Sequence, residues 1–134
     1  MGSIHDDRKR LESLVERLPD TELSERNVEL LLDFKHHLEA QNASTGHVLR
    51  HLYSFKSLAP EIDFDLDEAE KKEVRELVAA INRNDVNGKD YSVHTLAKFK
   101  KALSRFYRWH TGEDDPEIID FLTTHVKKSE KPKT

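Results

Sequence analysis

The amino-acid sequence predicts an all-α protein. Along several segments, apolar residues recur at steps of three and four, the spacing that places them on one face of a helix. The 134 residues include only four glycines and four prolines, and 36% of them are charged, which is typical of a helical domain with a solvated exterior. No segment shows the alternation of a strand. We therefore expect four principal helices, a short helix at the C-terminal end and a possible extra helix at the N-terminal end.

The first two predicted helices lie on either side of Pro19. Residues 6–18 carry four aliphatic side chains at helical spacing, and the proline ends this segment. Ser24 is a suitable N-cap for a helix that reaches about Ala40, because its hydroxyl can accept from a free backbone N–H. We expect the apolar stripe of this helix to consist of Val28, Leu31, Leu32 and Leu38, with Phe34 at its edge.

The next predicted helix runs from Ser44 or Thr45 to Leu58. Its apolar residues are again spaced for one face, and Pro60 ends it because the residue before a proline avoids helical geometry. The stripe consists of Val48, Leu52 and Phe55, widened by Leu49 and Tyr53.

A connector and a turn flank the following helix. Residues 60–66 form the connector, with two or three apolar anchors. Asp67 is expected to cap a helix that reaches about Asn82. Asn87 and Gly88 then give the strongest turn signal in the chain.

The last long helix is predicted between Ser92 and Gly112. Serine is a suitable N-cap, and glycine is a suitable C-cap because it readily adopts left-handed geometry. Asp115 and Pro116 look like the N-cap and first residue of a final short helix, which would use Ile118, Ile119, Leu122 and Val126.

The chain divides into three regions: a 1–23 N-terminal extension, a 24–126 helical domain, and a polar 127–134 linker or tail. There is no cysteine, so thiolate chemistry is excluded. No apolar run approaches membrane-spanning length, and the N-terminus lacks the apolar core of a signal peptide. We therefore expect no membrane partner and a cytoplasmic location.

Charge is unevenly distributed along the chain. Asp and Glu (26) outnumber Lys and Arg (22), yet residues 41–60 and 91–112 contain no acidic residue. Within 92–110, basic residues recur at steps of three and four, on a different helix face from the apolar ones. Because the local field decides where an anion binds, this face favours a polyanion as partner. Its residues are His94, Lys98, Lys101, Arg105 and Arg108.

Metal and enzyme sites are not indicated. Among eight histidines, His47 and His51 are four residues apart, but no His-Glu-x-x-His or cysteine cluster supplies further ligands. We expect them to be polar surface histidines and expect no metal or cofactor. There is no glycine-rich phosphate loop and no nucleophile elbow, and the acid-rich 61–76 segment does not follow the calcium-loop pattern. The chain is therefore not expected to be an enzyme on its own.

Three readings of the basic helix remain open. Residues 94–98 offer the mix of short polar and long basic side chains that reads a major groove. The alternative is a solvated face on a helical adaptor, which would bind a protein through the acid-rich helix at 67–82 or the LESLVERL segment. A stand-alone DNA-binding regulator is a third reading.

Three stretches resemble the N-terminal core-binding domain of tyrosine recombinases, the phage-integrase or Xer-like family. The first is Ser44-Thr45 followed by HVLRHLYSFKSLA, and the second is Tyr91-Ser92-x-x-Thr95 followed by LAKFKKALSRFYRWH. The third is Asp115-Pro116 with a short helix and the KKSEKPKT end. The resemblance covers roughly residues 24–134.

The resemblance implies a SAM-like four-helix bundle that clamps duplex DNA with its second and fourth helices, here at 44–58 and 92–112. The acid-rich connector would point away from the duplex. The family's catalytic domain would follow Thr134, so the implied partners are double-stranded DNA and that domain, with possible self-association on DNA. Tyr53, Tyr91 and Tyr107 are not expected nucleophiles, since core or turn packing explains each. The implied DNA-binding residues are Thr45, His47, Arg50, Ser54, His94, Thr95, Lys98, Lys101 and Arg105.

Overall fold

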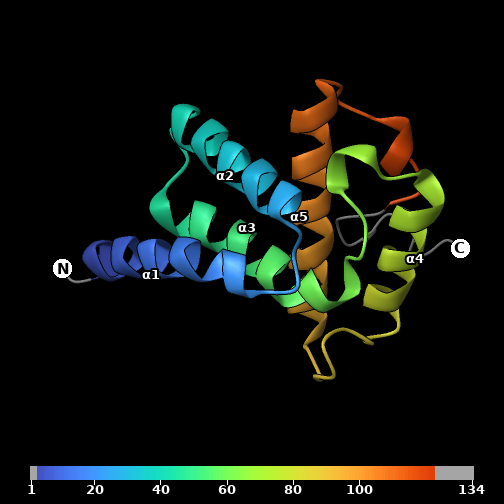
Figure 1. The fold of residues 1–134 in the computed structure, drawn as a ribbon, viewed down its shortest axis with the longest axis horizontal. Helices are drawn as coiled ribbons and strands as arrows, with labels where there is room; N and C mark the ends of the chain where they lie inside the picture. The colour runs from blue at the N-terminus through green and yellow to red at the C-terminus, as the bar shows by residue number, and fades with distance from the viewer. Residues whose placement is uncertain (1–2, 123–134) are drawn as a thin grey trace, which may run out of the picture.

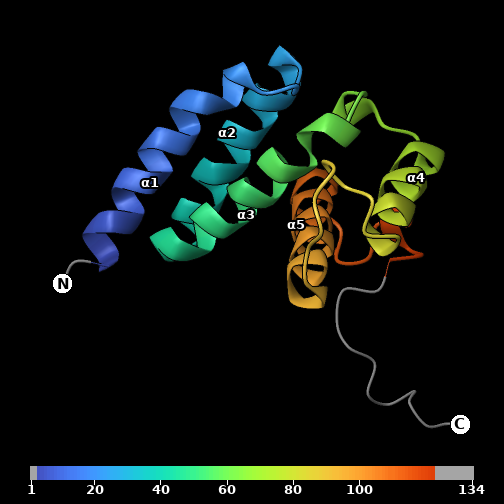
Figure 2. The ribbon, with the colours of Figure 1, turned by 90° about the horizontal axis from the view of Figure 1, so that it is seen from below.

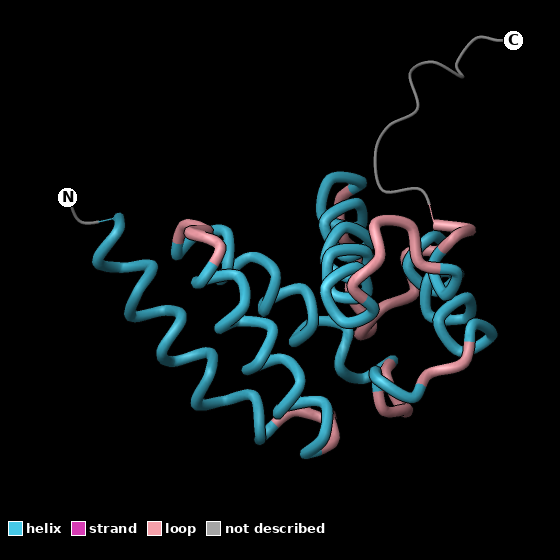
Figure 3. The backbone as a smooth tube through the Cα atoms, turned by 90° about the horizontal axis from the view of Figure 1, so that it is seen from above, coloured by secondary structure: helices cyan, strands magenta, loops and turns pink. Residues whose placement is uncertain are grey.

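Five α-helices build the part of the chain that the structure describes, which confirms the all-α prediction. The computed structural model describes residues 3–122, and no strand occurs in that range. In chain order the helices are α1 (Ser3–Arg17), α2 (Glu25–Ala40), α3 (Thr45–Leu58), α4 (Lys71–Asn82) and α5 (Val93–Thr111). The loops lie at the helix ends (Figure 3).

Helix α5 lies between a group of three helices and the single helix α4. On one side lie α1, α2 and α3, and on the other lies α4 (Figure 1). In the view turned by 90°, α5 is seen nearly end-on between them (Figure 2). Helix α3 packs against α1, α2 and α5, so it is the central helix of its group.

The extra N-terminal helix belongs to the same hydrophobic core as the rest. Leu11 and Leu14 of α1, and Leu18 in the 3-10 turn that directly follows it (Leu18–Asp20), are buried and join the core cluster. Burying aliphatic side chains of this size stabilises the fold by about 1.5–3 kcal/mol each relative to exposure. The segment 1–23 therefore contributes packing to the domain that follows it.

Aromatic rings join α2, α3 and α5. Phe34 of α2 lies edge-on to Phe106 of α5, with ring centroids 5.5 Å apart, and edge-on to Phe55 of α3 at 6.4 Å. Trp109 covers the same cluster, with its centroid 5.5 Å from that of Phe34. The prediction that Phe34 lies at the edge of its stripe was wrong. It is fully buried, because α5 covers that side of α2.

Serine residues cap three of the helices, as was predicted for Ser24 and Ser92. The hydroxyl oxygens of Ser24, Ser44 and Ser92 each accept from the backbone N–H three residues later, at 3.1, 3.1 and 3.2 Å. Gly112 ends α5 in left-handed geometry at φ +75°. Asn87 and Gly88 both have positive φ in the predicted turn, where Val86 and Lys89 form an isolated bridge.

Helix α4 begins later than predicted. Asp67 does not cap it. That residue lies in a 3-10 turn (Leu66–Glu68), and α4 starts at Lys71 after the N-cap Glu70. Glu70 and Glu73 form a reciprocal capping box there.

The predicted final helix is only a 3-10 turn, Glu117–Ile119. Pro116 takes its N-cap position, so the prediction of Asp115 as N-cap was wrong. Val126 and the predicted linker at 127–134 lie outside the described residues.

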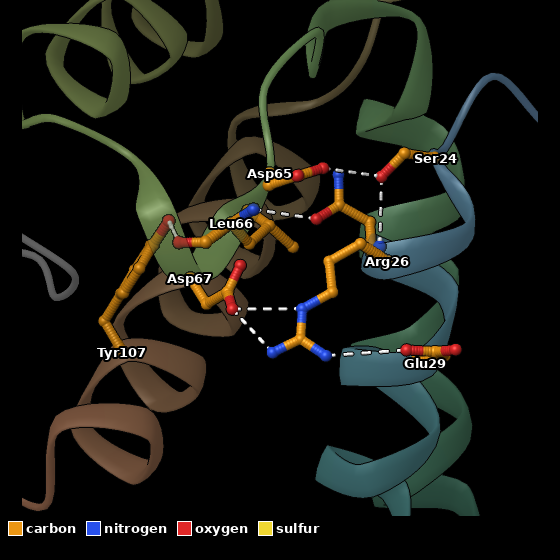
Figure 4. Close-up of polar contacts among 8 residues, drawn as sticks. Ser24, Arg26, Glu29, Asp65, Leu66, Asp67 and Tyr107 are labelled. Carbon is orange, nitrogen blue, oxygen red and sulfur yellow. Dashed lines mark hydrogen bonds and ion pairs between the residues drawn. The ribbon is translucent and has the colours of Figure 1, made fainter.

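Side chains from two helices fix the connector between α3 and α4. Asn27 of α2 is fully buried, donates to the carbonyl of Phe64 at 2.8 Å and accepts from the N–H of Leu66 at 2.7 Å. Tyr107 of α5 donates to the carbonyl of Leu66 at 2.8 Å. Arg26 grips Asp67 through Nε and Nη2 at 3.0 and 2.7 Å (Figure 4). These contacts place the acid-rich connector against the start of α2 and the last turns of α5.

Candidate nucleic-acid interface

The basic face of α5 is presented to solvent. Lys98 and Lys101 are exposed, and Arg105 is half-buried. The opposite face packs inward, since Phe99 and Phe106 are buried. Helix α5 is therefore held by one side and offers cations on the other, as its two stripes predicted.

No cation of this face is paired with a carboxylate among residues 3–122. The ion pairs of that range involve α1, α2, α4 and the loops. Lys100, on a different side of α5, donates to the amide oxygen of Asn82 at 2.8 Å. The charge on the basic face is thus available to an external anion.

Helix α3 adds to this surface where it packs against α5. His47 lies in the first turn of α3, and its Nε2 is 3.2 Å from Nη1 of Arg105. Arg50 is exposed one turn further along. The structure therefore brings together residues of the two acid-free segments that are 58 positions apart.

Two of the candidate residues on α3 do not lie on this surface. Ser54 is only 5% exposed, and its hydroxyl donates to the carbonyl of Arg50 at 3.1 Å. Its burial removes it from the candidate interface. Thr45 lies on the other side of α3, in a groove shared with Leu11 and Val15 of α1. At the start of α5, His94 is exposed, whereas the half-buried Thr95 accepts from the hydroxyl of Ser92 at 3.1 Å.

The two histidines of α3 form a pair at the packing interface with α5. Their Nε2 atoms are 3.2 Å apart. The expectation that both are surface residues was wrong for His51, which is only 8% exposed and lies against Phe34. Burial, with the nearby charges of His47, Arg105 and Arg50, lowers the pKa of His51 to about 4. Burial and the two arginines also lower the pKa of His47. Among residues 3–122 no cluster of three metal-ligating side chains occurs.

A cleft at the end of the basic face was not among the predicted sites. It has a volume of about 390 Å³ and lies between α2 and the C-terminal end of α5. One sign of this cleft was present in the sequence, since Arg108 belongs to the basic stripe. The sequence could not show that α2 forms the other wall, because that depends on how the helices pack. Its lining residues include His37, Gln41, Arg105, Arg108, Trp109 and Glu113.

The tyrosines differ in their surroundings. Tyr107 is 1% exposed, and burial raises the pKa of its hydroxyl far above the usual range, which fits a packing role. Tyr91 packs edge-on against Phe99 at 5.0 Å. Tyr53 is 38% exposed, so packing does not explain it as was expected.

No protein-family model, curated protein or solved structure matches the chain. In the part of the chain that the structure describes, no helix has the length and apolar character needed to cross a membrane.

Proposed function

We propose that the chain binds duplex DNA through the basic face of α5 and the adjoining start of α3. The observation that carries this proposal is the set of cations without carboxylate partners among residues 3–122, in a protein with more acidic than basic residues. Lys and Arg that are free to neutralise phosphates release counterions, which is the main source of affinity for DNA.

The dimensions of α5 suit this role. From His94 to Arg108 the basic face rises by about 21 Å at 1.5 Å per residue. A major groove is about 12 Å wide, so one helix of this length reaches across it to phosphates on both sides. His47 and Arg50 extend the positive surface sideways onto α3.

Within this proposal, the domain is the core-binding domain of a site-specific tyrosine recombinase. Support comes from the resemblance of the segments 44–58 and 91–110, which supply the two helices at the candidate interface. Strand cleavage would then belong to a domain that follows Thr134. A native gene without such a downstream segment would favour the stand-alone regulator instead.

The test of DNA binding is a charge reversal at the basic face. We expect Lys98→Glu with Arg105→Glu to abolish binding of a short duplex at low salt, measured by fluorescence anisotropy. Because Arg105 also contacts His47, a second variant, Lys98→Glu with Lys101→Glu, changes only exposed side chains. A matched control is Lys72→Glu with Arg75→Glu, which applies the same charge change to exposed residues of α4.

Binding by the native chain should weaken steeply as salt rises, and the α4 control should bind like the native chain. Circular dichroism would establish that all variants stay folded. Equal affinity of the native chain and the Lys98→Glu, Lys101→Glu variant at low salt would refute the proposal. Absence of duplex binding by the native chain would favour the helical adaptor.

A further inference from the structure

A cluster of nitrogen atoms lies where α3 packs against α5. Nε2 of His47 is 3.2 Å from Nη1 of Arg105 and also 3.2 Å from Nε2 of His51. Arg50 projects from the same side of α3, one turn later, and is exposed. The cluster thus combines two arginines and two histidines from two helices. Its side chains contact one another, which distinguishes it from the solvated lysines of the basic face.

The hydrogen bonds define the protonation state of His47. A guanidinium N–H can only donate, so Nε2 of His47 carries a lone pair that accepts from Arg105. The buried His51, with its pKa about 4, is neutral at pH 7, and its Nε2 lies 3.2 Å from Nε2 of His47. The single proton of His47 is therefore on Nδ1. In this state His47 is an uncharged acceptor that holds Arg105.

The local field favours an anion over a metal ion. The charges that shift the pKa values of both histidines are those of Arg105 and Arg50, with His47 acting in addition on His51. Two imidazole nitrogens 3.2 Å apart could chelate a metal, but a guanidinium N–H already occupies the lone pair of Nε2 in His47. A divalent cation would also meet the repulsion of both arginines.

Carboxylates from the neighbouring helices stand at the far side of α3. Helix α1 brings Asp7 next to Gly46, where its Oδ2 lies 3.1 Å from the position of an added Cβ. Helix α2 brings Lys35, which pairs with Glu39 at 3.0 Å across the groove from Thr45. The side of α3 that faces α5 carries the cluster and apolar side chains such as Phe55, which packs against Phe106. After the end of α5, Glu113 and Asp114 line the cleft that Arg105 also lines.

We propose that His47, Arg50 and Arg105 bind a phosphate-type oxyanion, and that His47 takes up a proton from solvent when the anion binds. The identity of the anion as an internucleotide phosphate of duplex DNA rests on the proposed function. A proton on Nε2 removes the lone pair that holds Arg105, so the guanidinium becomes free to bind the anion. The imidazolium then adds a third positive charge at the site.

Proton uptake links affinity to pH. The affinity rises as pH falls between the pKa of His47 in the complex and its lower pKa in the free protein. One linked proton changes affinity by up to about tenfold per pH unit in that range. The site therefore binds DNA most tightly under mildly acidic conditions.

The test compares His47→Gln with a control at another histidine. Glutamine keeps an amide oxygen that can accept from Arg105 but does not titrate. His36→Gln is the control, because His36 is exposed on α2 and the chain contains eight histidines. Duplex affinity is measured at fixed ionic strength at about pH 8 and about pH 5.5, the range in which histidine titrates. We expect the native chain and the control to gain about tenfold as pH falls, and His47→Gln to gain far less.

A second measurement reports on the site directly. NMR titration of the His47 imidazole gives its pKa in the free chain, with duplex, and with inorganic sulfate, which stays an oxyanion throughout. We expect both ligands to raise this pKa. A rise in the pKa of His47 with sulfate but not with duplex would assign the site to a free anion. The inference would be overturned if neither ligand raised the pKa of His47. It would also be overturned if the duplex affinity of His47→Gln depended on pH as strongly as that of the native chain. If the native chain binds no duplex at any pH, the proposed function fails, and the sulfate titration alone decides the oxyanion site.

Discussion

The connector side of the molecule and the α3–α5 surface use the same kinds of charged residue in opposite ways. Around the connector, Asp67 accepts two hydrogen bonds from the guanidinium of Arg26, and Asp65 accepts from the hydroxyl of Ser24 at 2.9 Å. At the α3–α5 surface, cations lie beside one another without a carboxylate partner among residues 3–122. Pairing within the fold identifies charges that serve structure, and its absence identifies charges available to a ligand.

This contrast also explains the acid-rich composition of residues 61–76. Glu61 accepts from the backbone N–H of Asn87 at 3.0 Å, and Glu73 takes part in the capping box of α4. Such carboxylates fix the connector and the turn before α5. They are therefore compatible with an anion-binding surface elsewhere on the molecule.

The largest effect should come from the connector side. Asn27→Ala leaves the buried carbonyl of Phe64 and the N–H of Leu66 without partners. We expect it to lower the free energy of unfolding by about 3 kcal/mol. Urea denaturation measures the change, with Asn82→Ala as the control because Asn82 is exposed. The folded fraction should bind duplex with native affinity. A loss of stability under about 1 kcal/mol would mean that the connector is held chiefly by other contacts.

The α3–α5 surface should respond in affinity and not in stability. Arg50→Ala removes an exposed cation, so we expect duplex affinity to fall by up to about tenfold and the salt dependence to lose about one counterion. Urea denaturation should show an unchanged free energy of unfolding. Arg75→Ala on α4 is the matched control and should alter neither property. If Arg50→Ala lowered the free energy of unfolding and kept native duplex affinity, Arg50 would serve structure, as the charged residues of the connector do.

The smallest effect should be a pH dependence on the connector side. The hydrogen bond from Arg26 lowers the pKa of Asp67, and the positive charge of Arg26 lowers it further. Burial of the carboxylate acts in the opposite direction. A carboxyl whose pKa is lowered by folding stabilises the fold above its unfolded pKa of about 3.9, and this stability is lost as pH falls through the folded value. Oδ1 of Asp67 is buried without a hydrogen-bond partner among residues 3–122, and Oδ2 accepts from Nε and Nη2 of Arg26.

Arg26→Gln should therefore be less stable than the native chain near neutral pH, and the difference should shrink at about pH 3. Urea denaturation at both pH values measures it, with Arg75→Gln as the control. A difference that is constant with pH would show that the ion pair contributes no net stability, as surface pairs often do not.

Local signals predicted the helix ends well. Ser24, Ser44 and Ser92 each cap a helix through a hydrogen bond to a residue three positions away, so the interaction is visible in the sequence. Asp67 failed as a cap because its carboxylate binds Arg26, 41 positions earlier. That contact depends on the packing of the connector against α2, which helix periodicity does not reveal.

The candidate site was only partly predictable for the same reason. Charge and periodicity identified the basic face of α5 and the acid-free segment of α3, and the resemblance to a known family led us to expect them on one surface. They did not show that α5 buries Ser54 and His51, because the side of α3 that α5 covers depends on how the two helices cross. Arg105 was expected only as a DNA-binding residue, and its contact with His47 was not predicted.

The packing of α1 on α3 has a consequence for the thermodynamics of recognition. With Leu11, Leu14 and Leu18 in the core, α3 is confined before any ligand arrives. The side chains of α3 then need less ordering on association, which favours affinity through a smaller entropy loss. Under the proposed function, a chain without α1 would keep every proposed cation but would bind DNA with a less favourable entropy. The N-terminal helix thus preorganises a surface to which it supplies no charge of its own.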